Sequence, residues 1–228
     1  MKNEKALVIF SGGQDSTTCL YWALKNFAAV STITFDYGQR HRAELESAVK
    51  IANLASVQNE ILTLSSFDKM GNNSLTGGQE VSSVLNPETN LPNSFVPGRN
   101  LIFLTYAAAY AYSNGISNLV GGMCQTDYSG YPDCRRNTLD VLMEAIDLGM
   151  KAQIKLHTPL MNLTKAESVR LAIEVGALEA LSFSHTCYNG VYPPCGICPA
   201  CKLRAKGFEE VKIGDPIFNR ARAFHESM

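Results

Sequence analysis

The alternation of short apolar runs with longer amphipathic segments most restricts how this chain can fold. The apolar runs are continuous and rich in β-branched residues, as in strands of a parallel sheet that are buried on both faces. The segments between them repeat their apolar residues at helical spacing, which indicates crossover helices. The pattern therefore predicts an α/β fold with a mostly parallel sheet. The predicted strands are 6–10, 30–35, 60–64, 118–120 and 155–157, and the predicted helices are 15–26, 40–55, 97–114, 136–149 and 164–175.

Two regions interrupt this alternation. Residues 65–98 are rich in Asn, Ser, Gly and Pro and are far longer than the usual connection of about 4–6 residues. We interpret them as an active-site flap or a disordered segment. Residues 182–201 contain a group of cysteines and are expected to form a compact loop tied by a metal. The last predicted helix has clear ends, because Thr164 and Glu167 have the spacing of a capping box and Gly176 can stop the helix.

Composition excludes several classes of protein. The 228 residues carry 20 basic and 21 acidic side chains, and 46% of the residues are hydrophobic. The hydrophobic fraction is ordinary for a globular protein and argues against disorder, and the absence of an excess of basic residues argues against a nucleic-acid partner. No apolar run approaches the twenty or so residues of a membrane span, and the apolar run at 6–10 is too short for a signal peptide. We expect a cytoplasmic protein with no membrane partner, folded as one domain over 1–228, with 182–204 as an embedded metal-binding segment.

The segment Ser11–Ser16, with the sequence SGGQDS, joins the first strand to the first helix. Its glycines permit a tight turn, and the helix N-terminus and hydroxyl groups offer hydrogen-bond donors to an anion. A carboxylate repels phosphate unless a cation lies between them, so Asp15 is a candidate Mg²⁺ ligand. The segment is neither a Walker loop nor a dinucleotide fingerprint. The alternative interpretation is an ordinary strand-to-helix turn in which Asp15 caps the helix.

Four cysteines follow one another with the spacing C-x7-C-x2-C-x2-C. Four soft ligands fill a tetrahedral shell and leave no open position for water, which suits structural zinc. Reduced thiols, a redox C-x-x-C pair and an iron–sulfur cluster remain alternatives. We assign Cys19 to the core, and Cys124 and Cys134 to structural positions or to the wall of a substrate site. The candidate metal ligands are Cys187, Cys195, Cys198 and Cys201.

Residues 125–136 are dense in groups suited to a purine-like heterocycle. Carboxylates can accept hydrogen bonds from an amino group and a ring N–H, tyrosines can stack, and arginine can bind a carboxylate with two hydrogen bonds. A solvated polar loop is the alternative. Arg99 is either an anion contact or a surface charge at a helix start, and Lys165 is either a polyphosphate contact or a solvated helix end. The candidates for substrate binding are Arg99, Asp127, Tyr128, Asp133 and Arg135.

Ser-Gly-Gly-x-Asp-Ser after the first strand resembles the PP-loop of the N-type ATP pyrophosphatases. With the segments 35–41, 95–100, 125–135 and 185–190 and the later cysteines, the chain resembles the 7-cyano-7-deazaguanine synthase family from end to end. The resemblance implies a Rossmann-like sheet of the adenine-nucleotide α-hydrolase type, a C-terminal zinc loop, and ligation of a carboxy-deazaguanine to ammonia with cleavage of ATP to AMP and diphosphate. It further implies one zinc per chain, Mg²⁺ with ATP, and catalytic roles for Asp15, Ser16 and Lys165, and we expect a homodimer. The ATP-binding residues are then Phe10, Ser11, Gly12, Gly13, Gln14, Asp15, Ser16, Thr17 and Thr18.

Two rival functions differ in what they consume. One rival is another PP-loop enzyme. We do not expect a tRNA-thiolating enzyme, because the net charge is near neutral and no added RNA-binding domain is expected. We do not expect a glutamine-dependent amidotransferase, because the length leaves no room for a glutaminase domain. A zinc-binding interaction module would not release pyrophosphate from ATP.

Overall fold

The computed structural model describes residues 1–39, 42–65, 67–69, 73–76, 81–82, 84–126 and 131–220. Five parallel strands form one sheet in the order β3-β2-β1-β4-β5. The α/β class with a parallel sheet is therefore confirmed, and each strand lies within two residues of its predicted bounds. The strands are β1 (Lys5–Ile9), β2 (Ala29–Asp36), β3 (Asn59–Thr63), β4 (Asn118–Val120) and β5 (Lys155–His157).

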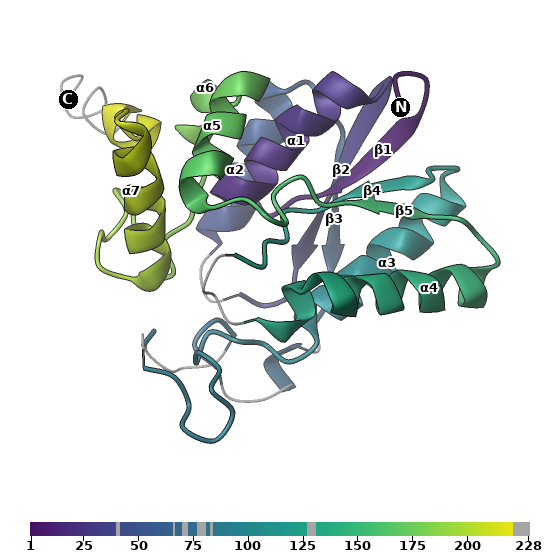
Figure 1. Ribbon diagram of the computed structural model, residues 1–228, viewed down its shortest axis with the longest axis horizontal. Helices are drawn as coiled ribbons and strands as arrows, with labels where there is room; N and C mark the ends of the chain where they lie inside the picture. Colours follow the sequence, from purple (N-terminus) through teal and green to yellow (C-terminus); the bar gives the residue numbers. More distant parts are fainter. Residues whose placement is uncertain are drawn as a thin grey trace.

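Helices cover both faces of the sheet (Figure 1). α1 and α2 lie on one face, α3 and α4 lie on the other, and α5 packs against α1 and, on its outer side, against α7. The helices are α1 (Gln14–Asn26), α2 (Ala43–Leu54), α3 (Arg99–Ser113), α4 (Arg136–Met150), α5 (Lys165–Val175), α6 (Leu178–Leu181) and α7 (Pro199–Val211), with short 3₁₀ turns η1 (Phe67–Lys69) and η2 (Pro132–Cys134).

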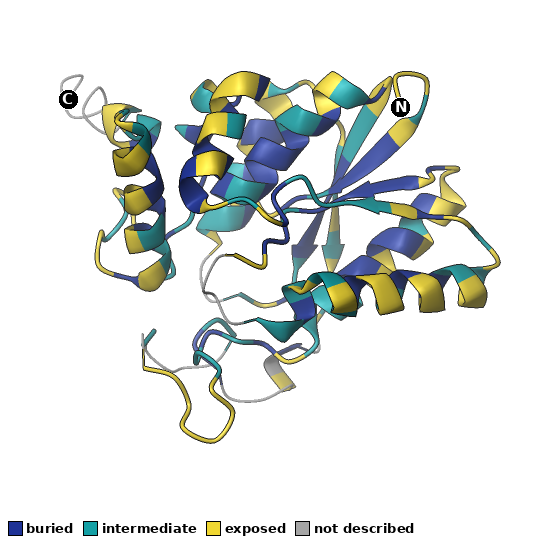
Figure 2. Cartoon of the chain, in the orientation of Figure 1, coloured by how far each residue is buried: buried dark blue, intermediate teal, exposed yellow. Residues whose placement is uncertain are grey.

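Strand β1 is the centre of the sheet and is buried on both faces. Ala6 and Val8 pack in one core cluster with α1 and α2, whereas Leu7 between them packs in a second cluster with α3 and α4. Figure 2 shows this burial continuing through the helices, whose outer faces are exposed. Alternate side chains of a strand point to opposite faces, so a continuous apolar run is what a doubly covered strand requires.

Two predicted helices begin later than expected. α3 starts at Arg99 rather than at 97, because its N-cap Gly98 adopts a left-handed conformation (φ +70°) that does not continue a right-handed helix. α2 starts at Ala43 rather than at 40, and residues 40 and 41 lie outside the described chain. Within the described residues, no helix combines the length and apolar character that crossing a membrane requires.

The region 65–98 packs against the sheet where the structure describes it. Phe67 and Val96 are buried in the core cluster of α3 and α4. Ser74 and Leu75 of the same region line the cavity described below, which favours the flap over the disordered alternative for these described parts. Residues 182–201 differ from prediction in another way, because the cysteine segment ends in the long helix α7, on which Cys201 lies.

The strand order places a topological switch point at β1, whose neighbours β2 and β4 continue toward opposite edges of the sheet. In open α/β sheets ligands bind at such a point, outside the carboxyl ends of the strands. The segments that leave these ends here are 10–13 after β1 and 121–124 after β4.

Candidate active site

A cavity of about 330 Å³ opens at the carboxyl ends of β1, β2 and β4. Its size is at the lower end of the range for small-molecule sites, about 300–1,000 Å³. The walls come from the glycine-rich loop, the first turns of α2, α3 and α5, and the cysteine segment. The lining residues include Phe10, Ser11, Gly13, Gln14, Asp15, Ser16, Tyr37, Glu44, Ser74, Leu75, Arg99, Phe103, Gly122, Cys124, Tyr131, Cys134, Lys165, His185, Thr186, Cys187, Tyr188 and Arg204.

The loop after β1 is held by its own hydroxyl groups and by contact with α2. Gly12 has a φ of +80°, and a Cβ there would lie 2.5 Å from the backbone nitrogen of Ala48. Only glycine fits this turn. Ser11 Oγ accepts from the Gly13 N–H at 3.3 Å, and Ser16 Oγ accepts from the Ser11 N–H at 3.3 Å. These bonds fix the loop in a shape that leaves the start of α1 facing the cavity.

The N-terminus of α1 offers unpaired donors. Across the described chain, the backbone N–H groups of Gln14, Asp15 and Ser16 have no hydrogen-bond acceptor. The carboxamide of Gln14 is 3% exposed and is without a partner among the same residues. Unpaired N–H groups at the positive end of a helix dipole are suited to binding phosphate.

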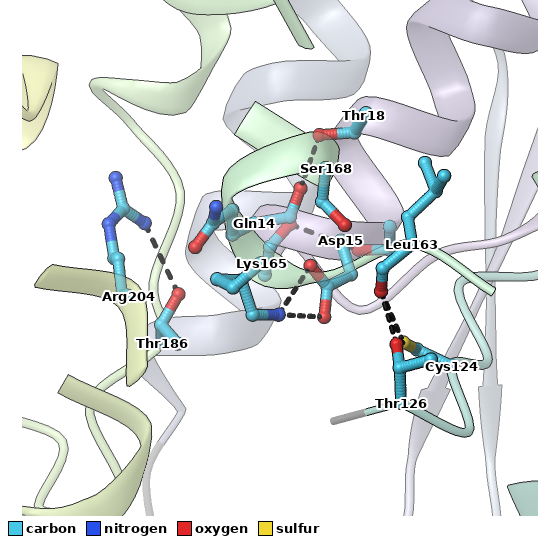
Figure 3. Close-up of polar contacts among 12 residues, drawn as sticks. Gln14, Asp15, Thr18, Cys124, Thr126, Leu163, Lys165, Ser168, Thr186 and Arg204 are labelled. Carbon is cyan, nitrogen blue, oxygen red and sulfur yellow. Dashed lines mark hydrogen bonds and ion pairs between the residues drawn. The ribbon is translucent and has the colours of Figure 1, made fainter. Parts of the chain in front are cut away.

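Asp15 and Lys165 form an ion pair in this cavity. Lys165 Nζ lies 2.9 Å from both carboxylate oxygens of Asp15 (Figure 3). The predicted capping box is confirmed, because Thr164 Oγ1 accepts from the Glu167 N–H and Glu167 Oε2 accepts from the Thr164 N–H. It fixes the start of α5, where Lys165 is the first residue. A Cβ on Gly207 of α7 would lie 2.6 Å from Cγ of Lys165, so α7 also holds this side chain in place.

Three of the predicted ATP-binding residues do not reach the cavity. Thr17 and Thr18 are buried and donate to backbone carbonyls of their own helix, those of Gly13 and Gln14. Gly12 contacts α2 instead of the cavity. Gly12, Thr17 and Thr18 stabilise the shape of the glycine-rich loop and of the start of α1. The other predicted ATP-binding residues line the cavity.

Arg99 points into an aromatic part of the cavity. Its Nη1 donates to the Tyr37 hydroxyl at 3.2 Å, and its guanidinium lies over the rings of Tyr37 and Tyr131, 5.7 and 5.9 Å from their centroids. Tyr131 Oη is 2.7 Å from Ser94 Oγ. The structure thus places Arg99 within a cluster of phenol rings, as a partly buried cation suited to an anionic or carbonyl group.

The structure separates the other predicted substrate residues. Asp133 is buried, and its Oδ2 accepts from the Asn100 N–H at 3.0 Å, which caps the start of α3. Arg135 is exposed and precedes α4. Neither residue lines the cavity, which differs from expectation; for Asp133 the reason is that its carboxylate is bound to the start of α3. Asp127 and Tyr128 lie outside the described residues.

Two other cysteines, Cys124 and Cys134, line the cavity. Burial raises the pKa of Cys134 to about 12, and the neighbouring Asp133 charge adds to this. Cys124 Sγ donates to the Leu163 carbonyl at 3.3 Å. A thiol is nucleophilic as its thiolate, so Cys134 is a wall residue of the cavity. Burial also raises the pKa of Cys19, which belongs to the core cluster of α1 and α2.

The four remaining cysteines form one cluster. Their Sγ atoms all lie within 4.8 Å of one another, close to the spacing of thiolates around one tetrahedral ion with bonds of about 2.3 Å. Backbone N–H groups point at three of the sulfurs, from Cys195 to Cys187, from Cys198 to Cys195 and from Cys201 to Cys198. Donors of this kind stabilise thiolates, so the cluster fits a metal ion.

The cysteine segment is part of the cavity wall. The backbone N–H of His185 donates to the Gly12 carbonyl at 2.9 Å, which joins the segment directly to the glycine-rich loop. Arg204 of α7 is 3% exposed, forms two hydrogen bonds with Asp215 at 2.6 and 2.8 Å, and donates to the hydroxyls of Ser184 and Thr186. This buried network fixes the segment between α7 and the loop.

Glu44 is the cavity residue that the sequence interpretation missed most clearly. It lies in the first turn of α2 and is half-buried. Burial raises the pKa of its carboxyl from 4.5 to about 7, although the nearby Arg99 charge lowers it. In sequence it belongs to an ordinary amphipathic helix, and only the contact of α2 with the glycine-rich loop brings it to the site.

The pKa of Glu44 predicts a dependence of stability on pH. Because the folded-state pKa is raised, the folded chain loses stability as the pH rises from about 4.5 to about 7. We expect Glu44→Gln to remove this loss and to raise the free energy of unfolding by about 1–2 kcal/mol more at pH 8 than at pH 5. Urea unfolding at both values measures it. Glu46→Gln, at an exposed position of the same helix, is the control and should show no such difference.

A loop rich in glycine and serine at the switch point of a parallel sheet, with Asp15 and Lys165 paired at its end, is typical of PP-loop α/β proteins. The family model of "Queuosine biosynthesis protein QueC" matches residues 5–212, so the chain belongs to this family. It is 58% identical over 224 residues to a 7-cyano-7-deazaguanine synthase of Chromobacterium violaceum, covering 97% of this chain and 96% of the relative. It is 48% identical over 215 residues to the one of Bacillus subtilis, covering 93% and 97%. The chain is accordingly an enzyme of the carbon–nitrogen ligase class.

Solved structures of low identity share the fold. A 4-thiouridine synthetase in complex with RNA and bound ATP has a TM-score of 0.51 at 18% identity, over 92% of this chain and 50% of that one. A U34-tRNA thiolase of Methanococcus maripaludis with a [4Fe-4S] cluster has a TM-score of 0.50 at 17% identity, over 93% and 66%. These similarities show that the chain shares its fold with these two proteins.

Proposed function

We propose that this enzyme converts 7-carboxy-7-deazaguanine and ammonia to 7-cyano-7-deazaguanine, with cleavage of two ATP to AMP and diphosphate. The observation that carries the proposal is the shared cavity: the glycine-rich loop with Asp15 and Lys165 lines the same space as Arg99 and its tyrosines. A nucleotide and an aromatic second substrate can therefore meet in one site. The names of the relatives give 7-cyano-7-deazaguanine as the product, which supports a 7-deazaguanine base as that aromatic substrate.

The first half of the reaction activates a carboxylate, which is a poor electrophile. A carboxylate oxygen attacks the α-phosphorus of ATP, the bond to the β-phosphate oxygen breaks, and diphosphate leaves. Ammonia then adds to the acyl carbon, AMP departs with that oxygen, and one proton is lost to give the amide. The free N–H groups at the start of α1 and the Lys165 ammonium are positioned to stabilise the charge that develops on the phosphates.

The second half dehydrates the amide in the same site. The amide oxygen attacks the α-phosphorus of a second ATP and diphosphate leaves. Departure of AMP, with loss of the two N–H protons, forms the nitrile. The contribution of the protein is positioning and charge stabilisation in both halves, so one set of residues serves twice.

Two metals belong to the proposal. Asp15 is the residue that would hold Mg²⁺ against the phosphates, and the ion would neutralise charge on diphosphate as it leaves. Cys187, Cys195, Cys198 and Cys201 would hold one structural zinc, since four thiolates leave no position to activate water. The expectations of a cytoplasmic homodimer that binds small molecules and no nucleic acid remain predictions.

Oxygen labelling tests the proposed chemistry. We expect 7-carboxy-7-deazaguanine with ¹⁸O in both carboxylate positions, incubated with ATP and ammonium, to give the nitrile and two AMP that each carry one ¹⁸O. Mass spectrometry measures nitrile and nucleotide together. Formation of ADP in place of AMP, or AMP without label, would contradict adenylation. A lack of any ATP consumption would favour a zinc-binding interaction module.

A further inference from the structure

Glu44 is held rigidly at the edge of the cavity. Its backbone carbonyl packs against the glycine-rich loop so closely that a Cβ on Gly12 would lie 2.6 Å from the carbonyl oxygen. The side chain extends from this fixed point into the cavity that Arg99, Tyr37, Tyr131 and Tyr188 also line. A carboxylate is thus fixed among aromatic rings at the site where the second substrate is proposed to bind.

The carboxylate of Glu44 has no hydrogen bond or ion pair within the described part of the chain. The positive charge of Arg99 acts on this carboxylate. The Arg99 guanidinium itself donates a hydrogen bond to the Tyr37 hydroxyl and lies over two tyrosine rings. A half-buried acceptor without protein donors needs water or a ligand to supply them, and it can therefore accept hydrogen bonds from a substrate that displaces water. Burial raises the pKa of Glu44 to about 7, so the charged carboxylate is less favourable here than in water.

Glu44 and Arg99 together match the hydrogen-bonding edge of the pyrimidinone ring of a deazaguanine. The pyrimidinone ring donates from N1–H and from the 2-amino group and accepts at O6, and a carboxylate beside a guanidinium accepts twice and donates once. Adenine presents an acceptor at N1, which a carboxylate would repel. The phenol rings around Arg99 offer surfaces on which a flat heterocycle can stack.

We propose that Glu44 is the specificity-determining residue for the base: its two carboxylate oxygens accept from N1–H and the 2-amino group, while Arg99 donates to O6. The inference rests on the proposed function. It replaces the expected role of Asp133, whose carboxylate caps α3 and does not reach the cavity. It also leaves the reactive carboxylate, on the five-membered ring and away from the 2-amino group, free to reach the nucleotide.

The test is a double-mutant cycle in which one change is made in the enzyme and the other in the substrate. In the wild type, removal of the 2-amino group from the substrate (7-carboxy-7-deazahypoxanthine) is expected to lower kcat/KM about 10–100-fold, as for loss of a charge-assisted hydrogen bond. Glu44→Gln is expected to lower kcat/KM for the full substrate by a similar factor. In that variant, removal of the 2-amino group should then cost less than about threefold, because the contact is already lost. Glu46→Gln is the matched control and should behave as the wild type.

The pH profile gives a second readout. The groups that face Glu44 are Arg99 of α3, Tyr37 after β2 and Tyr188 of the cysteine segment, and burial raises the pKa of both tyrosines. Among these groups, therefore, only Glu44 titrates near neutrality. We expect kcat/KM for the base to fall below about pH 7 in the wild type and to lose this limb in Glu44→Gln.

Different failures have different meanings. Equal losses of Glu44→Gln on both substrates would overturn the inference in favour of a structural role. A raised KM for ATP alone would assign Glu44 to the nucleotide, and a lowered kcat without coupling to the 2-amino group would assign it to proton transfer. Should Glu44→Gln not fold, the N1-methyl analogue with wild-type enzyme decides, since full activity with it contradicts the contact. Absence of nitrile from the wild type with the full substrate would instead refute the proposed function.

Discussion

Asp15→Asn is expected to lower the rate of pyrophosphate release at least about 100-fold, the size of effect seen when a contact to a developing anion is lost. Two consequences of the substitution combine. The amide binds Mg²⁺ more weakly than the carboxylate, and the substitution removes the negative charge that lies 2.9 Å from the Lys165 ammonium. The assay is pyrophosphate release at saturating ATP and base, with initial rates compared at equal concentrations of folded enzyme.

The ion pair of Asp15 and Lys165 is partly buried, so the substitution affects stability as well as activity. Lys165 is 9% exposed and Asp15 is 31% exposed, so breaking the pair should also lower stability to a modest degree. Asp140→Asn is the matched control, because it removes a carboxylate that pairs with Arg136 at 2.8 Å on the surface of α4. It should retain full activity. Near wild-type pyrophosphate release by a folded Asp15→Asn enzyme would remove Asp15 from the catalytic machinery.

The sheet was predictable because its signal is local. The central strand β1 is buried on both faces, so its apolar residues Ala6, Leu7 and Val8 follow one another without interruption. The start of α5 was predictable for the same reason, since a capping box is formed by residues three positions apart. The position of the site followed from the order of strands and helices, as ligands bind at the carboxyl ends of parallel strands.

The rest of the site depends on contacts between distant segments. Asp133 had the right chemistry for a base contact, yet in the fold its carboxylate caps α3. Glu44 had no distinguishing sequence context, and the packing of α2 on Gly12 places it in the cavity. Helix α7 was missed because Pro199 and the cysteines at its start indicate a loop, whereas Pro in the first turn of a helix is favourable.

Cys198→Ser is expected to release the metal and to unfold the cysteine segment. The substitution is informative because Cys198 is also the N-cap of α7, where its Sγ accepts from the Cys201 N–H. Serine is a good N-cap residue, so the variant keeps the cap and loses only the thiolate ligand. Metal binding and folding are coupled, and structural zinc contributes on the order of 10 kcal/mol in small domains. We therefore expect a loss of at least several kcal/mol of local stability, which hydrogen exchange of α7 measures.

Metal content and ATP binding should change together in this variant. Elemental analysis should find about one zinc in the wild type and in Cys19→Ser, whose thiol belongs to the core, and none in Cys198→Ser; iron would indicate a cluster instead. Because His185 donates to the Gly12 carbonyl, loss of the segment also removes a support of the glycine-rich loop, and the KM for ATP should rise. A Cys198→Ser enzyme that stays folded and fully zinc-loaded yet is inactive would contradict the structural role and require a catalytic thiol.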